Sequence, residues 1–264
     1  DTPQGVRAIT DYNGINGFGH KPDIVTMNNA HTTHFTDTPE EGIAYALEGW
    51  PSKPGETEAK HDVRFKDMRV WNVPTNARAW GGGETRINGN SIFVFSIGDL
   101  CIAHLGHLHH RLTRDHLDEL GRIDVLMVPI DGSFTMGQPL MVDVVEQLQP
   151  KVVMPMHYWG RYQLDRFMSQ MERLEPNFVI PDRPVVELAK EELPEKLTVI
   201  AVSFCGSSSF TTSMTCLAGR TKAGSCGASR PMMAAAIWPV MRSCTWRMRR
   251  SRSETSTLRE IVPG

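Results

Sequence analysis

The apolar and polar positions of the first fifty residues predict strands separated by loops. Residues 6–10 and 23–27 are short apolar runs that predict strands, and the Gly/Asn-rich residues 13–17 predict the loop between them. Thr38-Pro39-Glu40-Glu41 combines a capping box with proline at the first helical position. This segment predicts a helix that runs to about Leu47.

Antiparallel strands are expected in the next part of the chain. Residues 62–73 and 91–97 predict extended segments, and Gly98-Asp99 predicts a hairpin turn that leads into residues 100–105.

Residues 113–174 show the pattern of a parallel α/β unit. Thr113 predicts the start of a short helix, and Gly121 predicts its end. Residues 124–130 form a continuous apolar run, as expected for a strand buried on both faces. The order continues with a helix over about 139–148, a strand over 151–156 and a helix over about 162–174. Hairpins followed by such units predict an α/β fold in which helices cover sheets.

Composition agrees with a globular protein but divides the chain in two. The 264 residues are 40% hydrophobic and 22% charged, with a net charge of −2. Residues 201–264 carry a net charge of +7 and residues 1–200 a net charge of −9. We therefore expect one domain over 1–200 and an atypical basic tail, rich in Ser, Arg, Met and Cys, over 201–264. Three interpretations of the tail stay open: a flexible extension, a Met-rich helix near 231–250 that binds a partner or acidic surface, and an out-of-frame translation, which we favour.

The chain shows no targeting or membrane signal. No apolar run approaches the roughly 18 residues needed for a membrane span, and the chain opens without the basic start and apolar segment of a signal peptide. A precursor cleaved before Asp1 would leave the same sequence, so a cytoplasmic, periplasmic or secreted location stays open. Four arginines lie close together in the tail, but no nucleic-acid-binding module accompanies them.

Histidines gather where expected strands end. Residues 104–110 hold four of the ten histidines, His31 and His34 follow the strand at 23–27, and His157 follows the strand at 151–156. Strand ends hold the backbone in place while loops bring side chains together, and neutral imidazole is a common zinc ligand. The pattern predicts a metal site. The alternative is a set of hydrogen-bonded histidines that line a cleft; His20, His61 and His116 fit ordinary structural roles.

These segments resemble the metallo-β-lactamase fold family, in particular its lactonase-like and phosphodiesterase-like hydrolases. The resemblance covers about residues 6–199 and rests on four stretches: residues 23–34, 102–107, 128–136 and 153–158. It implies an αββα sandwich with metal at the edge shared by two sheets. Family members begin with a further strand pair, which we expect this chain to lack.

The resemblance also implies a depleted ligand set. The family's His-x-His-x-Asp-His loop has Asn29 and Thr33 at its first His and its Asp, which leaves His31 and His34. Its middle-loop His has no counterpart, with Asn76 as the best substitute, and its bridging Asp is His107. The final His is retained as His157.

Imidazole bridges two close cations poorly, because it is neutral and binds through one nitrogen at a time. We therefore expect at most one tightly bound metal, zinc or another divalent ion, held by His34, His107 and His157 with His31, His109 or His110 nearby. Three His and water form an open catalytic zinc geometry, which presents hydroxide at neutral pH.

Three residues are candidates for catalysis beside the metal. His31 is both a candidate ligand and a candidate catalytic residue. Asp131 is a candidate for orienting water or a ligand His, or else it caps the turn Asp131-Gly132-Ser133. His110 is a candidate for protonating a leaving group; a supporting or surface role is the alternative.

The sequence thus predicts a metal-dependent hydrolase that uses a metal-bound hydroxide on a small-molecule ester, lactone or phosphodiester. The alternative is a catalytically impaired relative that binds a small ligand or metal in the same cleft, which Asn29, Thr33 and His107 favour. The oligomeric state stays open.

Overall fold

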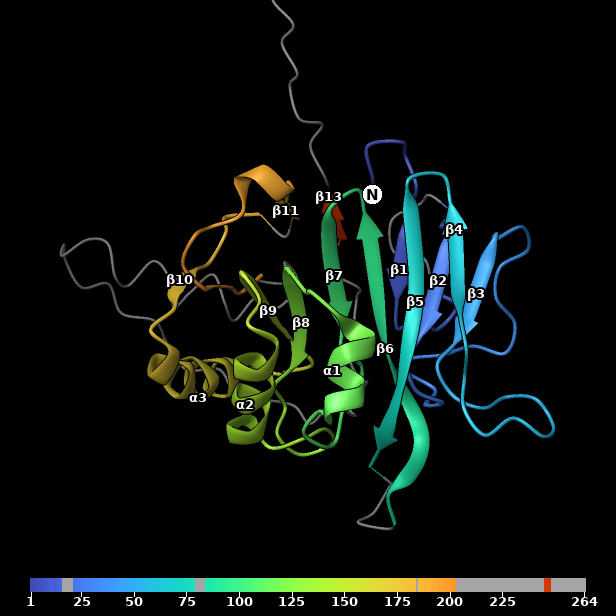
Figure 1. The fold of residues 1–264 in the computed structure, drawn as a ribbon, viewed down its shortest axis with the longest axis horizontal. Coiled ribbons are helices and arrows are strands. Elements are labelled where there is room, and N and C mark those ends of the chain that lie inside the picture. The colour runs from blue at the N-terminus through green and yellow to red at the C-terminus, as the bar shows by residue number, and fades with distance from the viewer. Residues whose placement is uncertain (16–20, 79–83, 184, 203–244, 248–264) are drawn as a thin grey trace, which may run out of the picture.

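The computed structural model describes residues 1–15, 21–78, 84–183, 185–202 and 245–247 (Figure 1). Its main sheet has eight strands in the order β10-β12-β9-β8-β7-β6-β5-β4. The antiparallel half is a meander of β4 (Asp62–Phe65), β5 (Met68–Ala77), β6 (Arg86–Ile97) and β7 (Leu100–His104). The parallel half continues with β8 (Val125–Pro129), β9 (Val152–Met156), β12 (Thr198–Ile200) and β10 (Asn177–Val179).

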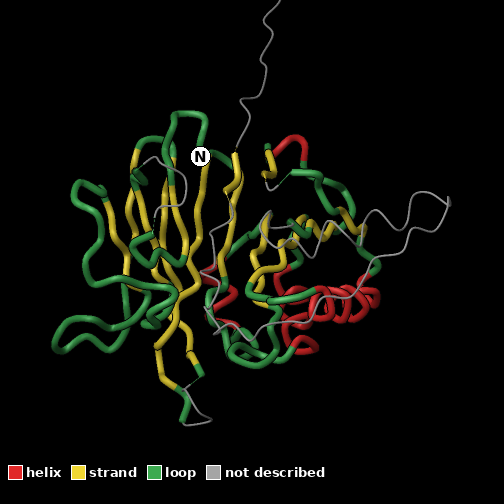
Figure 2. Tube along the Cα trace, turned by 180° about the vertical axis from the view of Figure 1, so that it is seen from behind, coloured by secondary structure: helices red, strands yellow, loops and turns green. Residues whose placement is uncertain are grey.

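The three α-helices among the described residues cover one face of this sheet (Figure 2). They are α1 (Arg114–Leu120), α2 (Gln138–Leu148) and α3 (Arg161–Met171), and a 3₁₀ turn at Glu172–Leu174 extends the last of them. Thr113 caps α1 and Gly121 follows its end, as the sequence predicted. Strand β8 is buried along its whole length, which confirms the expectation for the apolar run at 124–130.

A three-stranded parallel sheet packs on the opposite face and completes the α/β sandwich. It consists of β1 (Ala8–Thr10), β2 (Ile24–Met27) and β3 (Tyr45–Glu48). Ile24 and Leu47 share a buried apolar layer with Phe93 and Phe95 of β6. The predicted two-sheet fold is confirmed.

The helix expected from Thr38 to Leu47 is wrong. Residues 43–44 follow a turn in which Gly42 has φ +80°, and β3 then pairs with β2. Capping residues stabilise a helix by only about 1 kcal/mol. Strand pairing and the burial of Leu47 in the sheet interface outweigh that local preference.

Little of the tail lies within the described residues. Strand β11 (Val185–Glu187) pairs in parallel with β13 (Thr245–Arg247). The remainder of residues 203–264, and with it most of the Met-rich segment at 231–250, lies outside the described residues. Among the described helices, none has the length and apolar character to cross a membrane.

The carboxyl ends of the strands meet at one edge of the sandwich. Strands β7, β8 and β9 run parallel, so the segments after them leave the main sheet on the same side. The end of β2 joins them there, because Asn28 Nδ2 donates to the carbonyl oxygens of Ser91 and His104. Loops from both sheets therefore converge at this edge.

Candidate metal centre

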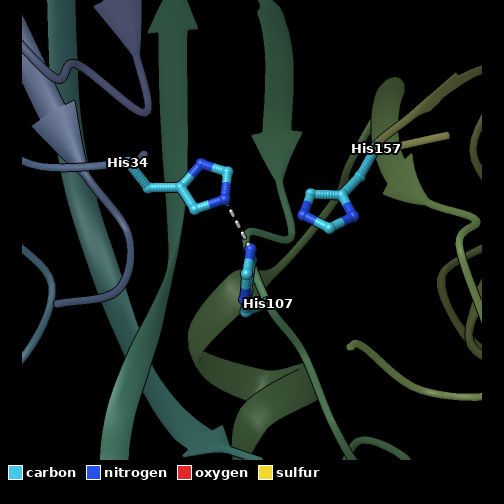
Figure 3. A group of neighbouring side chains, drawn as sticks. All are labelled: His34, His107 and His157. Carbon is cyan, nitrogen blue, oxygen red and sulfur yellow. Dashed lines mark hydrogen bonds between the residues drawn. The ribbon is translucent and has the colours of Figure 1, made fainter. Parts of the chain in front are cut away.

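Three imidazoles converge at this edge (Figure 3). His34 lies in the loop after β2, His107 follows β7 and His157 follows β9, and one ring nitrogen from each lies within 4.8 Å of the others. His34 and His107 are buried and His157 is partly buried. These are the three residues that the sequence predicted first as ligands, and their side chains are close enough to share one ion.

A buried carboxylate orients His157. The His157 Nδ1–H donates to Asp131 Oδ1 over 3.1 Å, which leaves the other nitrogen of His157, Nε2, for the side of the other two rings. Burial alone would raise the pKa of Asp131, but the hydrogen bond and charge of His157, with bonds from Thr135 and Ser133, lower it well below its usual range. Asp131 Oδ2 also accepts from the backbone N–H of Ser133. The two interpretations of Asp131 are therefore compatible: it closes the turn and it orients a candidate ligand.

A second carboxylate, Asp11, faces the other side of the cluster. Its Oδ2 lies 3.4 Å from His34 Nδ1 and 3.6 Å from His104 Nε2. Burial would raise the pKa of Asp11, but the neighbouring His34 and His104 lower it well below its usual range. Asp11 was not among the site residues predicted from the sequence. Its position directly after β1, at the edge where the histidines gather, was the available signal.

His107 has an amide rather than a carboxylate behind it. Asn29 Nδ2 lies 3.2 Å from His107 Nδ1, and His107 Nε2 lies 2.9 Å from His34 Nε2. Burial lowers the pKa of His107 well below its usual range, and His34 and His157 lower it further. The ring is therefore neutral at pH 7.

Of the two remaining predicted site residues, His31 lies beside the cluster and His110 lies apart from it. The ring of His31 is centred 5.6 Å from that of His34, and its Nδ1 is bonded to the Thr33 hydroxyl. Both nitrogens of His110 are engaged elsewhere, because Nδ1–H donates to the Arg111 carbonyl and Nε2 accepts from the Asn76 N–H. The structure places His31 at the rim of the cluster and His110 outside it.

The donor set fits one divalent ion. Three neutral imidazoles are the ligands of one class of catalytic zinc site. Ligand histidines usually donate their second N–H to a carboxylate, carbonyl or water. Asp131 meets that requirement for His157, and Asp11 faces the corresponding nitrogen of His34.

Acidification should destabilise the metal-free protein. Burial lowers the pKa of both His104 and His107, so the folded state takes up their protons less readily than the unfolded chain. The contribution of the two histidines to the free energy of unfolding is fully present above the unfolded-state pKa of about 6.5. As the pH drops below that value, the free energy of unfolding decreases by up to about 1.4 kcal/mol per pH unit for each histidine. Urea unfolding with chelator at pH 7 and pH 5 measures the loss. His107→Gln should weaken the pH dependence; an equal dependence in that variant would contradict the assignment.

Comparison with known proteins places these features in a family. A model described as a β-lactamase superfamily domain matches residues 1–157. A UPF0173 metal-dependent hydrolase of Pyrococcus abyssi is 38% identical over 177 residues, covering 59% of this chain and 72% of the relative. Another from Pyrococcus horikoshii is 38% identical over 149 residues, covering 52% of this chain and 66% of the relative. The crystal structure of a candidate Zn-dependent hydrolase of the metallo-β-lactamase superfamily from Thermotoga maritima aligns at 26% identity, with a TM-score of 0.44, over 69% of this chain and 83% of that one.

Proposed function

The chain belongs to the metallo-β-lactamase superfamily, and on that premise we propose that it is a hydrolase dependent on one divalent metal ion. The observation that carries the proposal is the convergence of His34, His107 and His157 from three separate loops on one point. The two Pyrococcus relatives described above are named metal-dependent hydrolases. Zinc is the proposed metal, because imidazole suits it and three protein ligands are typical of its catalytic sites.

A bound zinc ion would act as a Lewis acid on the carbonyl or phosphoryl group of the substrate. The chain's own residues prepare the site for it. Asp131 holds the proton of His157 on Nδ1 and so leaves the lone pair of Nε2 free for the ion. Asp11 faces the corresponding nitrogen of His34. His109 is not one of the three converging imidazoles, which are His34, His107 and His157.

His31 is the proposed proton-transfer residue. Its ring lies at the rim, centred 5.6 Å from His34 and 6.4 Å from His107. Burial lowers the pKa of His31, and the neighbouring His34 and His157 lower it further. Such an imidazole is in its neutral form at pH 7, the form in which it can act as a general base.

The proposed substrate is a small ester, lactone or phosphodiester with an apolar part. Phe134 and Trp159 are 41% and 46% exposed, and their ring centroids lie 5.6 Å apart. The Trp159 ring centroid is 5.5 Å from that of His157. An apolar group that packs on these rings would lie next to the three imidazoles.

Removal of metal should abolish hydrolysis and its return should restore it. The protein is treated with chelator, dialysed, and assayed with a chromogenic ester, a lactone and bis(p-nitrophenyl) phosphate, with and without one equivalent of Zn²⁺. We expect turnover of at least one substrate only in the zinc-loaded protein. Equal turnover in the chelated protein would refute the proposal.

The alternative function is a relative that binds a metal or small ligand without turnover. The observation that favours it is the direct hydrogen bond between His107 Nε2 and His34 Nε2, which occupies both nitrogens with each other. Zinc binding in the same experiment without hydrolysis of any ester, lactone or phosphodiester would support this alternative.

A further inference from the structure

Asn29 connects the histidine cluster to a cation on β6. Its side chain is 3% exposed. Its Oδ1 accepts a hydrogen bond from Arg86 Nη1 over 3.2 Å, and its Nδ2 lies 3.2 Å from His107 Nδ1. The amide is thus held at both ends, by the guanidinium on one side and the imidazole on the other.

Arg86 determines the orientation of the Asn29 side-chain amide. A guanidinium has only donors, so the Asn29 atom that faces it must be the oxygen. The NH₂ group must then face His107 and donate to Nδ1. A neutral imidazole that accepts on Nδ1 carries its proton on Nε2. The orientation of the Asn29 amide therefore follows from the donor-only chemistry of Arg86, and does not depend on how Oδ1 and Nδ2 were assigned.

The rest of the chain of contacts agrees with this proton position. His107 Nε2–H points at His34 Nε2, 2.9 Å away, which must then be an acceptor. A neutral His34 that accepts on Nε2 carries its proton on Nδ1, which lies 3.4 Å from Asp11 Oδ2. Donors point the same way from Arg86 through Asn29 and His107 to His34.

Among the three candidate ligands, this arrangement of protons is incompatible with metal binding only at His107. An ion shared by the three histidines needs the lone pair of His107 Nε2, which here carries a proton. That proton has to move to Nδ1, and Nδ1–H needs an acceptor behind it. Asn29 can supply its oxygen only by rotating its amide, which would set its NH₂ group against Arg86.

We propose that Arg86, acting through the Asn29 amide, sets the tautomer of His107 and so opposes metal binding until the amide rotates. Arg86 is a positioning residue in this inference, which rests on the proposed metal site. His157 needs no such change, because Asp131 only accepts. His34 likewise needs no such change, because Asp11, which faces its Nδ1, also only accepts. His107 is therefore the ligand whose proton limits metal affinity.

The experiment compares wild type with Arg86→Met, Asn29→Asp and a control, Arg78→Met. Arg86→Met removes the donor that orients Asn29. Asn29→Asp keeps Arg86 and offers oxygen to both neighbours. Arg78 is a second arginine near the site, whose guanidinium donates to the Ser133 carbonyl, so Arg78→Met removes an equal charge elsewhere. Histidine side-chain ¹⁵N shifts of the metal-free proteins report the tautomer, and competition with a chromophoric chelator reports the Kd for Zn²⁺.

We expect the proton of His107 on Nε2 in wild type and Arg78→Met, and on Nδ1 in Asn29→Asp. In Arg86→Met we expect a shift toward Nδ1. Zinc should bind about 10- to 100-fold more tightly to Arg86→Met and Asn29→Asp than to wild type, the range typical of groups that orient metal ligands.

Two outcomes would overturn the inference. One is an Nδ1–H tautomer of His107 in the wild type. The other is an equal gain in zinc affinity from Arg78→Met, which would attribute the effect to charge alone. If no variant binds zinc, the proposed function fails, and the ¹⁵N shifts still decide whether Arg86 sets the tautomer.

Discussion

His34→Ala is expected to weaken zinc binding by about a hundredfold. Free energies of about 10–16 kcal/mol for zinc sites with four ligands correspond to about 3 kcal/mol for each ligand. His34 is buried, its Nε2 faces His107 and its Nδ1 faces Asp11, so no neighbouring group takes its place without moving. Chelator competition measures the Kd, and hydrolysis at saturating zinc measures any remaining activity.

His116→Ala is the matched control for that substitution. His116 belongs to the capping box of α1, where its Nδ1 accepts from the Thr113 N–H, and its ring is outside the cluster. The control should bind zinc as the wild type does. Equal losses in the two variants, or no loss in His34→Ala, would show that the three histidines do not hold the ion.

Gly106→Ala is expected to destabilise the fold by about 3 kcal/mol or more and to displace His107. Gly106 has φ +57°, a region that disfavours side chains by about 1–2 kcal/mol. An added Cβ would also lie 2.5 Å from both Asn28 Cβ and Asn90 Oδ1. Such overpacking typically costs a further 1–3 kcal/mol. Urea unfolding measures the loss of stability. Chelator competition measures the accompanying loss of zinc affinity.

The clash at Gly106 has no inexpensive relief. Asn28 donates to two backbone carbonyls, and Asn90 Oδ1 accepts the His107 N–H over 2.7 Å while its Nδ2 donates to Thr75. Moving either amide would break buried hydrogen bonds. Asn28 holds the end of β7 and Asn90 of β6 holds the loop after it, so the displacement would reach the candidate metal centre.

Gly98→Ala separates the two effects at Gly106. Gly98 has φ +56°, almost the same backbone conformation, but an added Cβ there would meet no atom within 4 Å. Its substitution should cost only the backbone term of about 1–2 kcal/mol and leave zinc affinity unchanged. Equal losses in both variants would mean that the approach to Asn28 and Asn90 is unimportant.

Local patterns in the sequence were enough for most elements of the α/β half. Thr113 and Gly121 bound α1 because capping and helix termination depend on a few adjacent residues. Strand β8 could be recognised because burial on both faces requires a continuous apolar run. The same kind of local signal failed at Thr38, where pairing with β2 converted an expected helix into β3. Gly42 was the one local sign of that outcome.

Sequence alone also determined which histidines converge. Residues that follow neighbouring parallel strands must leave the sheet at one edge, so a His after each strand end predicts a cluster without any knowledge of loop shape. That reasoning applies directly to His107 and His157, and the predicted strand end at residue 27 added His31 and His34. The groups behind the rings, Asp11, Asn29 and Arg86, were decided only by the tertiary structure. They come from strands far apart in the chain, and hydrogen bonds of about 3 Å depend on side-chain positions that residue order does not contain. For this reason the convergence of the candidate ligands could be predicted from the sequence, but the positions of their protons could not.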